Sequence, residues 1–179
     1  MTIDDMIEAT IGKEGGYSNH PDDKGGATMW GITERVARRN GYAGDMKALP
    51  RETAVAIYRH EYAIRPGFDA VAEISPEVGA ELFDTGVNMG PAVPSLWFQQ
   101  VLNALNDGGK LYADVAEDGD IGPSTLAAFR AYRKARGAQA DAVMLKALNA
   151  LQGARYIELS RSRMANESFA YGWLRTRVT

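Results

Sequence analysis

The sequence predicts a mainly α fold with one small β-hairpin. Apolar residues recur at helical spacing through most of the 179 residues, caps and glycines separate these segments, and no alternating stretch is long enough for a large sheet. The composition, 45% hydrophobic and 24% charged, is typical of a globular domain. A chain of this length can bury a core without disulfides, and the absence of cysteine excludes thiolate metal sites and cysteine nucleophiles.

The first expected helix begins after Thr2 and ends at the glycine pair 15–16. Thr2 is a suitable N-cap, and Asp5 places a negative charge near the positive helix end. One apolar stripe contains Ile3, Ile7, Thr10 and Ile11. At about 100° per residue, Glu14 falls on this stripe. We therefore expect Glu14 in the last turn, half against the core and half open to what lies beyond.

Residues 17–33 are rich in Asn, Pro, Asp and Gly, which predicts a loop with a small hairpin. Such a loop beside a helix end is a common place for a functional site.

The remaining chain is expected to be helical, with a turn-rich break at residues 108–123. The predicted helices run from Thr33 to about Asn40, from Pro50 to about Ala63, from Ser75 and Pro76 to near Gly90, from Pro94 or Ser95 to Gly108 and Gly109, from a cap at Ser124, and from about Gln139 to Met164.

Charge divides the chain into two regions. Residues 1–92 carry 9 basic and 15 acidic side chains, whereas residues 93–179 carry 11 basic and 8 acidic ones, for a net charge of -3. We expect a catalytic region at 1–92 and a second helical region at 93–179, packed as one compact unit. The overall balance argues against a nucleic-acid partner, which needs a basic face.

Several chemistries lack their motifs. No phosphate loop, dinucleotide fingerprint, zincin helix or serine-hydrolase elbow occurs. His20 and His60 have no metal-site spacing, and the calcium-loop likeness at residues 114–125 fails because Ala116 and Thr125 stand at ligand positions. We expect no metal and no cofactor.

Carboxylate chemistry remains possible. Cleavage of a glycosidic bond needs one protonated carboxyl and usually a second, ionised one. Glu14, on an apolar stripe at a negative helix end, suits the first role, and Asp22 or Asp23 in the polar loop suits the second. The alternative is a solvated glutamate followed by an ordinary Asx turn.

The stretch 14–33, EGGYSNHPDDKGGATMWGIT, resembles the signature of glycoside hydrolase family 108, the N-acetylmuramidases of phage endolysins and their prophage or gene-transfer relatives. It holds the EGG(Y/F) turn, the Asn and Pro loop, D-x-GG-x-T and the aromatic-Gly-Ile-Thr segment. The stretch 82–91, LFDTGVNMGP, matches the helical middle of the family. The stretch 118–129, DGDIGPSTLAAF, resembles the predicted peptidoglycan-binding domain that follows, so the resemblance covers essentially the whole chain.

This resemblance implies a lysozyme-like orthogonal helical fold that hydrolyses the β-1,4 bond between N-acetylmuramic acid and N-acetylglucosamine. It implies that Glu14 is the general acid, and that Asp23 and Thr28 complete the catalytic trio. Asp22 leaves the aspartate assignment open by one position. The chain departs from the family pattern at His20 and Lys24, where Asp and Pro are common.

Further residues are candidates for sugar binding. The candidates are Tyr17, Trp30, Tyr58 and Tyr62 for stacking, and Asn88 for a hydrogen bond to an acetamido group. Core packing is the alternative for each aromatic ring, and Asp84 is either part of the site or a buried acid satisfied by backbone amides. The basic side chains Arg155, Arg161, Arg163, Arg175 and Arg177 are either a wall-binding surface or solvated helix faces.

Two other functions stay open. A lytic transglycosylase also uses a glutamate but closes the sugar to a 1,6-anhydro end, and a non-catalytic module would bind peptidoglycan without cleaving it. We expect a monomer with no stable membrane insertion, made in the cytoplasm because no signal peptide is visible, and acting in the periplasm or cell wall after release.

Overall fold

The computed structural model describes residues 2–14, 16–18, 26–162 and 167–178; the side chains of Lys13, Glu14, Ser168 and Phe169 lie outside the description. In chain order the elements are α1 (Ile3–Glu14), β1 (Thr28–Met29), β2 (Ile32–Thr33), α2 (Glu34–Arg39), η1 (Met46–Ala48), α3 (Arg51–Tyr58), η2 (Arg59–Ile64), α4 (Phe68–Ile74), α5 (Pro76–Met89), α6 (Ala92–Ala104), α7 (Pro123–Arg136), η3 (Gly137–Gln139), α8 (Ala140–Ser162) and α9 (Glu167–Arg177).

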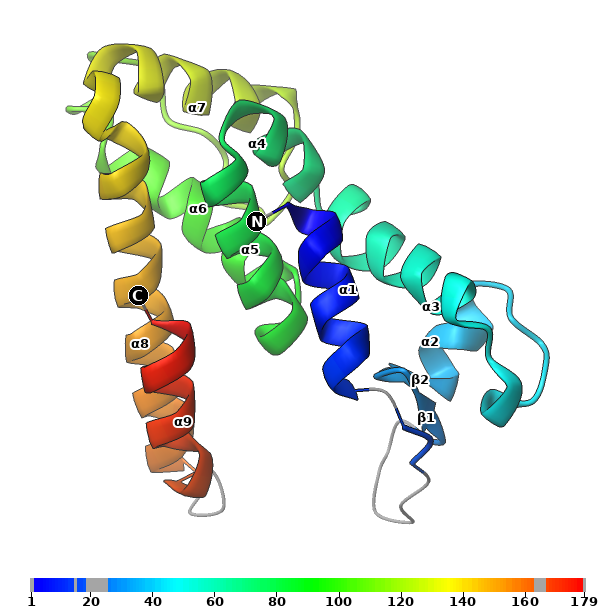
Figure 1. Ribbon diagram of the computed structural model, residues 1–179. Helices are drawn as coiled ribbons and strands as arrows, with labels where there is room; N and C mark the ends of the chain where they lie inside the picture. Colours follow the sequence, from blue (N-terminus) through cyan, green and yellow to red (C-terminus); the bar gives the residue numbers. More distant parts are fainter. Residues whose placement is uncertain (1, 15, 19–25, 163–166, 179) are drawn as a thin grey trace.

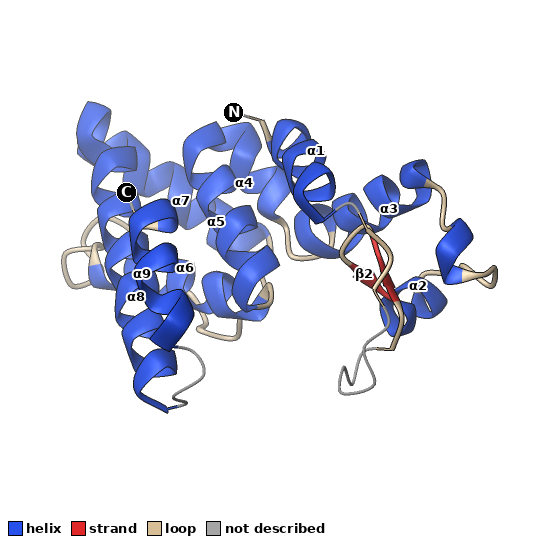
Figure 2. Cartoon of the chain, turned by 60° about the horizontal axis from the view of Figure 1, so that its bottom comes forward, coloured by secondary structure: helices blue, strands red, loops and turns tan. Residues whose placement is uncertain are grey.

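Helix α5 is the centre of the fold, and the predicted mainly α class is confirmed. It packs against α1, α4, α6, α8 and η2. Figure 1 shows α1 and α3 on one side of α5, and α6 and α8 on the other. The hairpin and α2 lie at one end of the molecule, and the antiparallel pair of α8 and α9 lies at the opposite end (Figure 2).

One hydrophobic core spans both halves of the chain. Its fully buried side chains include Ile7, Ile11, Phe68, Leu82, Phe83, Phe98, Phe129 and Met144. Full burial of one such side chain stabilises a fold by about 1.5–3 kcal/mol. The apolar stripes read from the sequence are thus the faces that hold α1, α5, α7 and α8 together.

The predicted helix starts at Thr2, Thr33 and Ser75 are confirmed. The backbone N–H of Thr2 donates to the Asp5 carboxylate at 2.8 Å, and the N–H of Asp5 donates to the Thr2 hydroxyl at 3.1 Å. The hydroxyls of Thr33 and Ser75 each accept a backbone N–H three residues later. Polar caps of this kind are local, and so a sequence reveals them well.

Two predicted boundaries are wrong. Helix α7 begins at Pro123, with Gly122 at the cap position and no side-chain cap, so Ser124 lies inside the helix. Proline has a fixed φ and no N–H to satisfy, which favours it at the first helical position. Helix α6 begins at Ala92 and ends at Ala104, short of Gly108. There the buried Asn106 side chain accepts the N–H of Gly109 at 3.0 Å and turns the chain early.

Five elements were not foreseen: helix α4, the π-helical turn η2, the short 3-10 turns η1 and η3, and the terminal helix α9. Helix α4 starts after Gly67, whose φ of 79° suits only glycine well. Gly79 allows α4 and α5 to approach closely, because a Cβ at this position would lie 2.5 Å from that of Ala72. These features depend on tertiary packing, which hydrophobic periodicity does not report.

Candidate active site

Helix α1 carries Glu14 in its last turn. Ile7 and Ile11 are fully buried and fix the helix against the core, and the helix ends at Glu14 as predicted. Thr10, one turn earlier, lines a groove beside the helix. The side chain of Glu14 and the whole of Asp22 and Asp23 lie outside the described residues.

The predicted hairpin follows the loop. Met29 pairs with Ile32, and Trp30 and Gly31 form the two-residue turn with φ of 56° and 75°. Two positive φ values are typical of a type I′ turn, in which a bulky first residue is unusual. The Trp30 indole Nε1 donates to the Leu49 carbonyl at 2.9 Å. This bond anchors the turn to the segment that precedes α3.

Thr28 has the most unusual environment in the hairpin. Its backbone pairs with Ser18, with N···O distances of 2.9 and 2.7 Å. Its side-chain Oγ1 is buried, yet it has no hydrogen-bond partner within the described part of the chain. An unpaired buried hydroxyl costs roughly 1–3 kcal/mol, so it requires an explanation.

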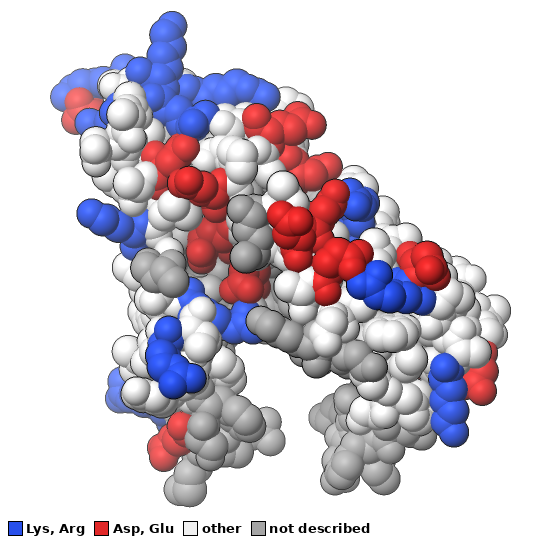
Figure 3. Space-filling model, viewed as in Figure 1, with Lys and Arg blue, Asp and Glu red and all other residues white. Residues whose placement is uncertain are grey.

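A groove of about 810 Å³ runs between α1, η2, α5 and the C-terminal helices. Figure 3 shows the molecule hollowed from below, between the part built by α8 and α9 and the part that carries the hairpin. The described residues that line the groove are Met6, Ala9, Thr10, Gly31, Tyr58, Tyr62, Glu77, Ala80, Glu81, Asp84, Val87, Asn88, Leu145, Asn149, Thr176 and Arg177.

The first wall of the groove is aromatic. The rings of Tyr58 and Tyr62 lie 5.5 Å apart, centre to centre, at an interplanar angle of 34°. Tyr58 is 4% exposed and belongs to the core, whereas Tyr62 is partly open and burial raises the pKa of its hydroxyl. Tyr62 stands on the π-helical turn, a geometry that often occurs at functional sites.

The second wall is polar and comes from α5, α8 and α9. The Arg177 Nη1 donates to both carboxylate oxygens of Asp84, at 2.9 and 3.0 Å. Asp84 is therefore satisfied by a guanidinium, and the alternative of backbone amides is wrong. Asn88 donates to the Asp84 carbonyl at 2.7 Å, which keeps its side chain along the helix.

Glu81 is a groove residue that the sequence did not reveal. Burial raises its pKa to about 7; the Thr85 hydroxyl, which donates to its Oε1 at 3.2 Å, lowers the pKa, and neighbouring Asp84 raises it. Gln152 from α8 donates in turn to the Thr85 hydroxyl at 2.8 Å. Desolvation of Glu81 comes from packing between helices far apart in sequence, so no local pattern signals it.

Three of the five predicted sugar-binding residues share the groove: Tyr58, Tyr62 and Asn88. The other two are not among its described lining residues. Tyr17 is 40% exposed, with the Lys47 ammonium 5.1 Å from its ring centre, and Trp30 is held by the bond to Leu49. The structure thus places Tyr58 and Tyr62 in the groove, and Trp30 and Tyr17 outside its described lining.

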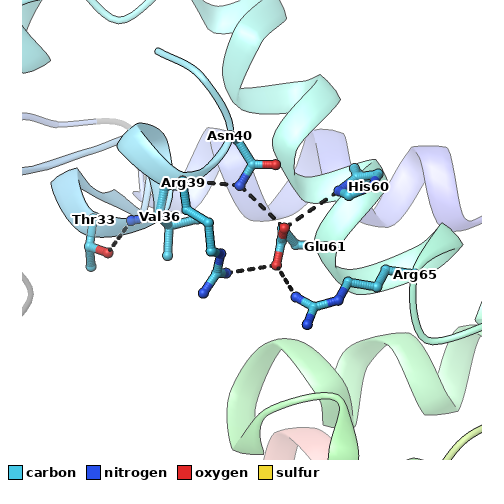
Figure 4. A network of polar contacts seen from close by, with 7 residues as sticks. All are labelled: Thr33, Val36, Arg39, Asn40, His60, Glu61 and Arg65. Carbon is cyan, nitrogen blue, oxygen red and sulfur yellow. Dashed lines mark hydrogen bonds and ion pairs between the residues drawn. The ribbon is translucent and has the colours of Figure 1, made fainter. Parts of the chain in front are cut away.

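A second polar network fixes η2, which carries Tyr62. Glu61 is 9% exposed and accepts hydrogen bonds from Arg39 at 2.7 Å, Arg65 at 3.0 Å and Asn40 at 3.3 Å (Figure 4). Burial alone would raise the pKa of Glu61, but Asn40 and the two guanidinium groups together bring it below the usual value. This network ties α2 to η2 and was not visible in the sequence.

The described residues offer neither a membrane-spanning helix nor a metal-binding cluster. No helix there is both long and apolar enough to cross a membrane. No group of three or more His, Cys, Asp or Glu side chains is placed to hold a metal ion in the ranges that the structure covers.

The chain is similar to known proteins over almost its whole length. Residues 7–90 match the family model described as "Glycosyl hydrolase 108", and residues 93–178 match the model described as "Predicted Peptidoglycan domain". Ten solved chains match, among them SagA from Brucella abortus, which is 28% identical with a TM-score of 0.64. That match covers 94% of this chain and 85% of the other. The comparison with curated proteins found no match.

Proposed function

Residues 7–90 belong to the glycosyl hydrolase 108 family, and from that premise we propose how this peptidoglycan hydrolase works. The reaction is N-acetylmuramidase-type hydrolysis of the β-1,4 bond between N-acetylmuramic acid and N-acetylglucosamine. The glycan strand lies in the groove beside α1, where aromatic rings face polar side chains. Such a mixture of aromatic surface and a few placed polar groups suits a neutral, hydroxyl-rich ligand.

Glu14 acts as the general acid in this proposal. It occupies the last turn of α1, where the partial negative charge of the helix end disfavours the ionised carboxylate. The protonated carboxyl gives its proton to the glycosidic oxygen as the bond to the sugar breaks. A positioned acid of this kind contributes about 10²–10⁴ to a rate.

Asp23 stabilises the positive charge that builds on the sugar ring, or orients the attacking water, and Thr28 helps to hold that water. The buried hydroxyl of Thr28, which has no hydrogen-bond partner among the described residues, is the single observation that carries the proposal. A buried hydroxyl without a partner destabilises the fold, and a water or substrate atom that completes its hydrogen bonds would remove this cost. Asp22 is the alternative to Asp23.

The division of labour follows the two family matches, which meet between residues 90 and 93. This supports a catalytic region at 1–92 and a peptidoglycan-binding region at 93–179. The finer assignment is an endolysin of phage, prophage or gene-transfer origin that acts as a monomer on the cell wall, needs no cofactor and binds no nucleic acid.

Product analysis tests the reaction type. Muropeptides released from purified sacculi are separated and weighed by mass spectrometry. Hydrolysis adds one water and leaves a reducing N-acetylmuramic acid end, whereas a lytic transglycosylase leaves a 1,6-anhydro end that is 18 Da lighter, the mass of one water. Release of anhydro products, or binding without release, would replace the proposal by the corresponding rival.

A further inference from the structure

The C-terminal helix α9 contributes two residues to the groove. Thr176 and Arg177 line it together with Asn149 of α8, although all three belong to the second half of the chain. Figure 1 shows α9 lying against α8, on the side of α5 away from α3. One groove is therefore built from both halves.

Helix α9 is docked firmly enough to form a wall. Its Trp173 ring stacks on Tyr156 of α8, with centres 5.1 Å apart. Val178 packs over Gly153, where its nearest methyl carbon would lie at an ordinary contact distance of 3.6 Å from a Cβ. These contacts place the last turn of α9 next to α5.

Only one nitrogen of the Arg177 guanidinium, Nη1, donates hydrogen bonds to Asp84. Both hydrogen bonds to the carboxylate come from Nη1, whereas Nη2 and Nε have no partner among the described residues. The side chain is 31% exposed and lines the groove. Asp84 thus holds the planar guanidinium still, and the remaining N–H groups can meet an acceptor without further ordering of the side chain.

The charge of the groove determines which kind of ligand the remaining N–H groups of Arg177 can bind. Three carboxyl groups, those of Glu77, Glu81 and Asp84, and one basic side chain, that of Arg177, are found among its described lining residues. An anionic ligand would meet net repulsion there. Neutral hydroxyl and acetamido oxygens do not, and the partly open ring of Tyr62 on the aromatic wall offers an apolar face for a sugar ring.

We propose that Arg177, positioned by Asp84, binds acetamido or hydroxyl oxygens of the glycan strand in this groove, so that the second half of the chain forms one wall of the sugar site. This inference rests on the proposed function, since it takes the same strand as the ligand. It differs from a separate binding surface on the second half, which would leave the groove complete without α9.

The test measures binding without cleavage. The background is the Glu14→Gln variant, and the probe is the neutral tetrasaccharide of β-1,4-linked N-acetylglucosamine, titrated by calorimetry. Arg177→Gln in this background weakens binding about ten- to hundredfold, as expected for the loss of hydrogen bonds from a charged donor. Arg175→Gln is the matched control on the same helix, because Arg175 contacts the exposed Tyr171 and is not among the lining residues.

A second variant tests the groove wall without breaking the ion pair between Asp84 and Arg177. Thr176→Trp adds bulk to the groove wall at an exposed position and leaves Asp84 and Arg177 in place, with Arg175→Trp as its control. We expect Thr176→Trp to abolish binding at an unchanged melting temperature. If Arg177→Gln does not fold, Thr176→Trp decides the question.

The two proposals fail separately. Binding by Arg177→Gln or Thr176→Trp within twofold of the background overturns the role of α9, even when Glu14→Gln is inactive. Cleavage of sacculi by Glu14→Gln at the wild-type rate overturns the role of Glu14, and release of anhydro products, or of no products, by the wild type overturns the proposed reaction, whatever the binding results.

Discussion

The indole Nε1 of Trp30 donates to the Leu49 carbonyl at 2.9 Å, and Trp30 itself sits in a left-handed turn with φ of 56°. A non-glycine residue rarely adopts this conformation unless other contacts hold it there. The bond therefore stabilises the hairpin that starts with Thr28.

Trp30→Phe keeps an aromatic ring but removes this donor. We expect the free energy of unfolding to fall by about 1–2 kcal/mol, the effect of losing one hydrogen bond and leaving a carbonyl without its partner. Urea denaturation measures the change. Tyr17→Phe is the control, because Tyr17 is exposed, and it should lie within about 0.5 kcal/mol of the wild type.

Thr28→Val separates function from stability. Valine has nearly the same shape, so the variant loses the unpaired hydroxyl and should be as stable as the wild type or more stable. The rate of sacculus cleavage should fall by about tenfold or more if the hydroxyl holds the reacting water. The melting temperature and the initial rate are measured on the same sample.

For Thr33→Val we expect the opposite effects, a loss of stability and an unchanged activity. Thr33 caps α2, so its loss should lower stability by about 0.5–2 kcal/mol and leave the chemistry intact. If Thr28→Val instead lowers stability and retains full activity, Thr28 has a structural role only.

The raised pKa of Glu81 predicts that the stability of the protein depends on pH. Burial raises its pKa in the folded state to about 7 from the usual 4.5, so the folded protein holds this proton more tightly than the unfolded chain does. Stability from this group is complete below about pH 4.5 and is lost as the pH rises through 7. Glu81→Gln should therefore be more stable than the wild type at pH 8, by about 1–3 kcal/mol, and similar to it at pH 4.5.

Denaturation of both proteins at the two pH values tests this expectation. Glu77→Gln, one turn earlier on the same helix and exposed to solvent, is the control. An equal effect of Glu81→Gln at both pH values would show that the pKa of Glu81 in the folded protein is not raised.

The dependence of stability on pH has the opposite sign for Glu61. Its pKa lies below the usual value in the folded state, so its contribution to stability is present at neutral pH and is lost as the pH falls through the folded-state pKa. Glu61→Gln should cost about 1–3 kcal/mol at pH 7 and less at pH 3. Glu34→Gln, which breaks the exposed pair with Arg38, should change stability by less than about 1 kcal/mol at either pH.

The helices of this fold were predictable where the signal is local. Thr2, Thr33 and Ser75 cap helices as their side chains suggest, and the stripe through Ile7 and Ile11 is buried. The hairpin was expected from its turn residues. The start of α7 at Pro123 was missed because serine was preferred as a cap over proline at the first helical position.

The groove was predictable only in part. Tyr58 and Tyr62 stand one turn apart and line the groove with Asn88 of α5, but the sequence could not show that Arg177 bonds to Asp84, 93 residues earlier. It also could not show that Glu81 is desolvated or that Glu61 joins α2 to η2, because both depend on which helices become neighbours. Long-range packing of this kind has no signature in hydrophobic periodicity.

The role of Glu14 is tested most directly by the initial rate at which reducing ends appear from purified sacculi. Glu14→Gln keeps the shape of the side chain and removes the proton, and we expect the rate to fall by about 10²–10⁴ with an unchanged melting temperature. Glu8→Gln on the same helix, where Glu8 forms an exposed pair with Arg51, should cleave at the wild-type rate. A Glu14→Gln protein that cleaves as fast as Glu8→Gln would contradict the assignment of Glu14 as the general acid.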